Sequence, residues 1–84
     1  MTLTRAGLQE KVVEIVKTQV GKESADIEPA RLFTQYGADE LDCIEIVMRL
    51  EEEFGLEIND ADAQNLLSVS AAVRYLEEKL SLEK

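Results

Sequence analysis

Residues 37–55 read GADELDCIEIVMRLEEEFG and carry the most informative pattern in this chain of 84 residues. Asp39 and Asp42 stand at the N-cap and N3 positions of a capping box, here with carboxylates at both places. Gly55 is a suitable stop, because glycine readily adopts the left-handed conformation that ends many helices. The segment therefore predicts a helix from about Glu40 to Phe54.

Apolar residues fall on two separate faces of this predicted helix when successive residues are placed about 100° apart. The first stripe comprises Cys43, Ile46, Val47, Leu50 and Phe54. The second stripe comprises Leu41, Ile44 and Met48. A surface helix of a small bundle needs only one apolar stripe, so the second is either covered by the long loop or exposed for a partner. Acidic residues border it, which favours a partner, because an apolar patch with a charged rim is typical of a docking site.

The segment before this helix predicts another helix followed by a long loop. Apolar residues spaced by three and four residues indicate an amphipathic helix from about Thr4 to Val20, with Thr4 as its cap and Gly21 as its stop. Residues 22–39 show weak periodicity and contain the chain's only proline, so they predict a loop that needs anchoring. The apolar residues available for this are Ile27, Leu32, Phe33 and Tyr36.

The segment after Gly55 predicts a short helix and then a longer one. Asn59 or Asp60 can cap a short third helix that continues through Leu66, and Ser68 or Ser70 can cap the fourth. The fourth helix would carry Val73, Leu76 and Leu80. The expected fold is all-α: one domain over residues 1–84, a four-helix bundle with three longer helices, one short helix and a long first loop.

The charge of the chain is strongly acidic and is concentrated in one segment. The formal net charge at pH 7 is −9, and residues 39–53 contribute −6 of it through seven acidic residues and one basic residue. Such a surface repels nucleic acid phosphates and anionic membranes, which makes both poor partners and basic protein surfaces suitable ones. The other interpretation is that the acidity only keeps the domain in solution.

Composition argues against catalysis and metal binding. The chain has no histidine, which removes the commonest general base and the commonest metal ligand. EF-hand spacing and a glycine-rich phosphate loop are also missing. Cys43 is the only cysteine, so no intrachain disulfide can form and a reducing cytoplasm is the expected location. No apolar run is long enough for a signal peptide or a membrane span, so we expect no membrane insertion.

The same residues resemble the signature of acyl carrier proteins. The resemblance covers about residues 30–82 well, and the first helix only in length and pattern. Its segments are 37–42, 44–48 and 50–55, followed by Glu57-Ile58, Asn59-Asp60 and Ser68-Val69. It implies a four-helix bundle with a long first loop, in agreement with the periodicity.

The resemblance also implies where partners would bind. In this family a serine at the start of the second helix carries a 4'-phosphopantetheine arm, whose thiol holds acyl chains as thioesters. Partner enzymes recognise apolar and acidic residues of that helix. Carried over to this chain, the partner-docking positions are Asp39, Leu41, Asp42, Ile44, Glu45, Met48, Glu51 and Glu52.

This chain has Glu40 at the position of the family's serine. A carboxylate cannot form the phosphodiester that a serine hydroxyl forms, so no cofactor is expected with Glu40 in place. Ser24 and Ser68 are distant in sequence, and Thr34 lies outside the motif. Glu40 either stabilises the helix start through the helix dipole, imitates the negative charge of the arm's phosphate, or replaces a natural serine.

Cys43 is the only thiol close to the place where acyl chains enter in this family. It could carry an acyl group directly, but its position on the first stripe favours a core cysteine with a raised pKa.

We therefore expect a non-enzymatic, acyl-carrier-protein-like module, monomeric when free. It would dock onto basic surfaces of carrier-recognising enzymes of fatty acid, lipid or polyketide metabolism. One alternative is a functional acyl carrier in fatty acid biosynthesis, if Glu40 replaces a natural serine. The other is a structural subunit that buries the second stripe permanently in a complex.

Overall fold

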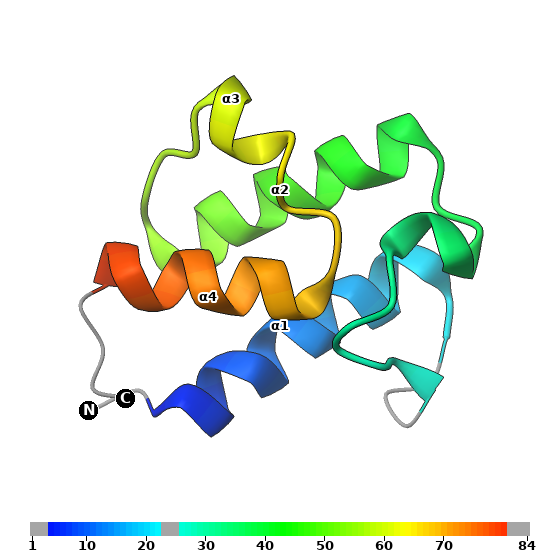
Figure 1. The fold of residues 1–84 in the computed structure, drawn as a ribbon, viewed down its shortest axis with the longest axis horizontal. Helices are drawn as coiled ribbons and strands as arrows, with labels where there is room; N and C mark the ends of the chain where they lie inside the picture. The colour runs from blue at the N-terminus through cyan, green and yellow to red at the C-terminus, as the bar shows by residue number, and fades with distance from the viewer. Residues whose placement is uncertain (1–3, 23–25, 81–84) are drawn as a thin grey trace.

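The computed structural model describes residues 4–22 and 26–80, which form an all-helical bundle (Figure 1). Its elements are α1 (Arg5–Val20), the 3₁₀ helix η2 (Phe33–Tyr36), α2 (Glu40–Phe54), α3 (Asp60–Ala63) and α4 (Val69–Leu80). Within these ranges the only β-type pairing is an isolated bridge between Leu32 and Ser68. The predicted fold class, with three longer helices, one short helix and a long first loop, is confirmed.

The first two predicted helices begin and end where their capping residues indicate. The Thr4 hydroxyl accepts a hydrogen bond from the backbone N–H of Gly7 at 3.0 Å, and α1 ends at Gly21 with φ of +71°. At the start of α2 the Asp39 carboxylate accepts from the backbone N–H of Asp42 at 2.8 Å. The Asp42 carboxylate accepts in return from the backbone N–H of Asp39 at 3.1 Å. This reciprocal pair is a capping box formed entirely by aspartates.

The third and fourth helices differ in detail from the prediction. Asn59 caps α3, but this helix spans only Asp60–Ala63 and does not continue through Leu66. The Leu66 side chain is buried and its backbone N–H bonds to the carbonyl of Ala63, so the chain turns inward there. Of the two candidate caps for α4, Ser68 accepts from the backbone N–H of Ala71 at 3.2 Å.

The core lies between α1, α2 and α4 and is mainly aliphatic. Helix α1 contacts both α2 and α4, whereas α3 lies at the edge of the molecule in Figure 1 and contributes no buried residue. The fully buried side chains of the three helices are Leu8, Val12, Val16, Ile46, Leu50, Val69, Ala72 and Leu76. These positions repeat every three to four residues along each helix, which is the periodicity read from the sequence.

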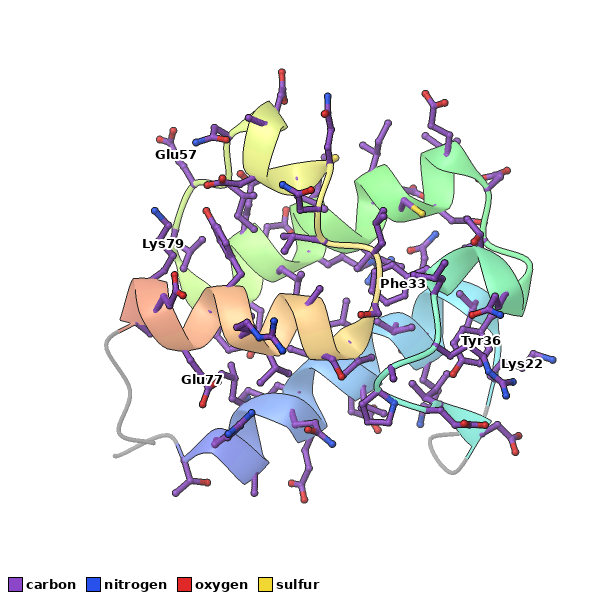
Figure 2. All side chains as sticks on the ribbon, in the orientation of Figure 1. Lys22, Phe33, Tyr36, Glu57, Glu77 and Lys79 are labelled. Carbon is purple, nitrogen blue, oxygen red and sulfur yellow. The ribbon has the colours of Figure 1, made fainter. Side chains whose placement is uncertain are left out.

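The long loop between α1 and α2 is anchored by buried side chains and by backbone bonds. Ile27 and Phe33 are buried, and Figure 2 shows Phe33 directed into the bundle. Tyr36 is half-buried and its hydroxyl accepts from the backbone N–H of Glu28 at 2.6 Å. Leu32 is different: its side chain is 45% exposed, so it contributes through the backbone bridge to Ser68 rather than as an apolar anchor.

Candidate functional site

The two apolar stripes of α2 have opposite environments. Ile46, Val47 and Leu50 of the first stripe are buried, and the other two members, Cys43 and Phe54, are half-buried against the core. The second stripe, which we call the outer stripe, consists of Leu41, Ile44 and Met48. These side chains are 63%, 49% and 53% exposed, respectively. The long loop therefore does not cover the outer stripe, and that alternative from the sequence is wrong.

The acidic side chains around the outer stripe differ in solvent exposure and in hydrogen bonding. Asp39, Glu40 and Glu52 are exposed, whereas Glu45 and Glu51 are half-buried. The Glu51 carboxylate accepts a hydrogen bond from the backbone N–H of Ile58 at 2.7 Å, so it also fastens the connection between α2 and α3. The structure thus brings all eight predicted docking residues onto α2 and its cap. Their docking role stays a prediction.

Asp42 is the most constrained carboxylate of this surface. One of its oxygens accepts from the backbone N–H of Asp39, and the other accepts from the side-chain amide of Gln19 at 3.0 Å. The hydrogen bond from Gln19, followed by that from Asp39, lowers the pKa of the Asp42 carboxyl below its ordinary value, because both donors favour the charged form. Asp42 therefore has a structural role in the helix cap in addition to its predicted role in docking.

Glu40 is the first residue of α2, and its side chain is exposed at the helix N-terminus. A carboxylate there interacts favourably with the helix dipole, by about 0.3–1 kcal/mol. The side chain has no hydroxyl group, and a phosphodiester needs one. The residue at this position therefore does not fit a phosphopantetheine arm.

Cys43 lies one turn further along α2 and is half-buried against the core. Burial raises the pKa of its thiol, and the negative charges of Asp42, Asp39 and Glu40 raise it further. A thiol that stays protonated is a poor nucleophile, so its environment agrees with the core interpretation. It is, however, less enclosed than the sequence predicted.

Two kinds of feature are absent from the described parts of the chain. Residues 4–22 and 26–80 contain no group of three potential ligand side chains placed to hold a metal ion. Among the helices of the same ranges, none combines the length and the apolar character needed to cross a bilayer.

The sequence reading missed Gln19, which lies in the last turn of α1 and contacts the acidic side of α2. Its amide donates to Glu45 at 2.7 Å as well as to Asp42, and accepts from the Arg49 guanidinium at 3.2 Å. A glutamine at a polar position of a helix carries no local signal, because only the packing of α1 against α2 brings these groups together. A hydrogen bond from Tyr75 of α4 to Asp62 of α3, at 3.0 Å, was missed for the same reason.

Comparisons of the sequence with known proteins identify a family and relatives. A family profile described as phosphopantetheine attachment site matches residues 10–76, which include most of α1. An acyl carrier protein of Solidesulfovibrio magneticus is 45% identical over 71 residues, covering 83% of this chain and 91% of that protein. An acyl carrier protein of Nitratidesulfovibrio vulgaris, strain Miyazaki F, is 41% identical over 73 residues, covering 86% and 96%.

A solved structure has the same fold. It is a free-standing peptidyl carrier protein from a secondary metabolic pathway of Acinetobacter baumannii, with a TM-score of 0.81 and 23% sequence identity. The match covers 94% of this chain and 99% of that protein. At this identity the similarity extends to the fold alone.

Proposed function

This chain belongs to the acyl carrier protein family, and we propose that it is a docking module of that family which carries no phosphopantetheine arm on residue 40. Glu40 is the observation that carries the first half of this proposal. Its carboxylate would give a mixed anhydride with phosphate, which water cleaves readily, in place of the stable phosphodiester of a serine. With Glu40 in place, the covalent attachment on which carrier chemistry depends has no acceptor.

The second half of the proposal rests on the surface beside Glu40. Three exposed aliphatic side chains of the outer stripe lie next to carboxylates, and the segment has a local charge of −6. The apolar centre would supply contact area. The carboxylates around it, which we call the acidic rim, would raise the rate of association with a basic partner surface and orient that partner. The partners that fit are basic surfaces of carrier-recognising enzymes of fatty acid, lipid or polyketide metabolism.

Glu40 has a part in docking as well. It places a negative charge at the start of α2, close to where the family's phosphodiester would stand. A partner that recognises this phosphate with lysine or arginine can pair with the Glu40 carboxylate instead. The proposed module therefore keeps the recognition surface of a carrier and lacks its cargo.

Intact-mass measurement tests the loss of the arm. The protein and its Glu40→Ser variant are each incubated with coenzyme A and a broad-specificity phosphopantetheinyl transferase, with Glu40→Ala as the matched control. We expect only Glu40→Ser to gain the mass of one arm, because it alone restores the hydroxyl. A gain by the unaltered protein would contradict the proposal. Failure of a folded Glu40→Ser variant to be modified would show that the surface is not recognised as a carrier.

A working carrier is the second candidate function, favoured by the match of the attachment-site profile across residue 40. It requires either that Glu40 stand in place of a natural serine or that another residue take the load. The same experiment identifies a carrier whose load is on another residue, because only then does the unaltered chain gain mass. If Glu40 replaces a natural serine, both functions predict a gain by Glu40→Ser alone.

A further inference from the structure

Gln19 makes three hydrogen bonds with charged side chains of α2. It is half-buried in the last turn of α1, and its partners Asp42, Glu45 and Arg49 follow one another at spacings of three and four residues. These spacings place all three partners on one face of α2. A single uncharged side chain of one helix thus engages two carboxylates and a guanidinium of the next.

The chemistry of the amide suits these partners. A glutamine side chain offers two N–H donors on one nitrogen and a carbonyl acceptor on the other side. Here the nitrogen faces Asp42 and Glu45 at 3.0 and 2.7 Å, and the oxygen faces Arg49 at 3.2 Å. The reversed orientation would direct the carbonyl oxygen at two carboxylates, so the charges determine which way the amide points. A glutamate would repel both carboxylates, and a lysine would repel Arg49.

Gln19 also separates two residues that would otherwise attract each other. Glu45 and Arg49 stand at i and i+4 with the acid first, which is the favourable order for an ion pair on a helix. Yet in the part of the chain that the structure describes they form no salt bridge, and each bonds to Gln19 instead. An ion pair would neutralise Glu45, whereas a bond to a neutral amide leaves its negative charge in place.

We infer that Gln19 is a positioning residue for the acidic rim: it fixes the carboxylates of Asp42 and Glu45 and keeps Glu45 from being neutralised by Arg49. This inference rests on the proposed docking function and extends it to a residue outside α2. The lowered pKa of Asp42, whose largest cause is the Gln19 hydrogen bond, agrees with it. The partner surface that fits is a basic one that needs two carboxylates in a defined place.

The test uses the full chain and two readouts. Gln19→Met keeps the length of the side chain and removes its hydrogen bonds, whereas Gln19→Glu keeps the shape and adds a third carboxylate. Gln9→Met, at a half-buried position near the other end of α1, is the matched control. The first readout is the pKa of the Asp42 carboxyl from an NMR titration. The second is the KM and kcat of a phosphopantetheinyl transferase acting on the Glu40→Ser chain with and without each change.

We expect Gln19→Met to raise the pKa of Asp42 towards its ordinary value of about 4. It should also raise the transferase KM about threefold with kcat unchanged, because rim charges act mainly on association. Gln19→Glu should raise the pKa of Asp42 further, because a carboxylate at residue 19 repels the charged form of Asp42, and Gln9→Met should change neither readout. A residue that only stabilised the fold would not separate KM from kcat.

Each contrary result has a distinct meaning. If Gln19→Met leaves the pKa of Asp42 unchanged, Gln19 does not hold that carboxylate and the inference is wrong. If the pKa rises but KM does not, the bond is structural only and the inference is wrong as well. The proposed function is checked in parallel with Glu52→Lys, which lies outside the Gln19 contacts. An increase in KM for Glu52→Lys alone would reject the role of Gln19 and leave the docking surface standing, whereas no increase for either would reject both.

Discussion

On one side of α2, Ile46 and Leu50 have no exposed surface, whereas on the other side Leu41 and Met48 leave 63% and 53% of theirs exposed. The two sides belong to one helix and are both apolar, so apolar character does not separate them. What differs is the neighbour, because the first side packs into the core shared with α1, and no described element buries the second. Fully burying a large aliphatic side chain stabilises by about 1.5–3 kcal/mol. Burial of the outer stripe against a partner would therefore contribute to the free energy of binding.

Removing a core side chain of α2 should have the largest effect on the free energy of unfolding. Leu50→Ala deletes a fully buried side chain and should lower the free energy of unfolding by about 2–5 kcal/mol, because the cavity adds to the lost burial. Ile44→Ala on the outer stripe is the matched control and should change it by no more than about 0.5 kcal/mol. Urea unfolding followed by circular dichroism measures both.

If Leu50→Ala proves too unstable to fold, Ile46→Val provides a smaller change at the neighbouring core position, of about 0.5–1.5 kcal/mol. Equal losses for the core and outer variants would show that the outer stripe is packed in solution, and the comparison would no longer hold.

The capping box stabilises the start of α2, and its removal should have the next largest effect on the free energy of unfolding. Asp39→Ala removes the side-chain acceptor for the Asp42 backbone N–H and should cost about 0.5–2 kcal/mol of stability. Asp39→Asn keeps an acceptor oxygen and should recover most of the loss. If asparagine destabilised as much as alanine, the contribution of Asp39 would come from its charge and not from the cap.

Acid should lower the free energy of unfolding, because it protonates the Asp42 carboxylate and weakens the hydrogen bonds that this carboxylate accepts. Its folded pKa lies below the ordinary value of about 4, so the stability it contributes is fully present above about pH 5 and is lost as the pH falls through the folded pKa. The stability difference between the unaltered chain and Asp42→Asn should therefore shrink between pH 6 and pH 3. Urea midpoints at several pH values measure this. A difference that stays constant or grows in acid would contradict the lowered pKa.

A charge reversal on the outer side should have the smallest effect on stability. Glu52 is exposed, so Glu52→Lys should change the free energy of unfolding by no more than about 0.5 kcal/mol. Its effect should appear in docking instead, as a higher transferase KM on the Glu40→Ser chain that depends on salt. A large loss of stability would show that Glu52 belongs to the packing of the fold and not to a free rim.

Local sequence signals predicted most of the fold. The bounds of α2 follow from Asp39 and Gly55, and the core side of each long helix follows from apolar residues three to four positions apart. Prediction was weaker where burial by distant segments decides the outcome. Helix α3 ends at Ala63 and Leu66 beyond it is buried, whereas Leu32 stays exposed although it is apolar. Neither fact is encoded in the spacing of neighbouring residues.

The candidate site divides in the same way. The outer stripe could be named in advance because α2 carries two apolar stripes, whereas the eight docking positions and the role of position 40 came from the resemblance to carrier proteins. Gln19 could not, because its three partners lie 23 to 30 residues away along the chain and meet it only across the packed α1–α2 interface. Hydrogen bonds of this kind have no local sequence pattern.

The sequence by itself determined the three longer helices, the caps of α1 and α2, the acidic character of α2 and the missing hydroxyl at residue 40, because each depends on residue type and on spacing within one turn or two. Only the tertiary structure decided that the outer stripe stays uncovered and that Gln19 bonds to Asp42, Glu45 and Arg49. Both depend on where α1, α4 and the long loop pack, and burial and hydrogen bonding between helices are set by that three-dimensional arrangement.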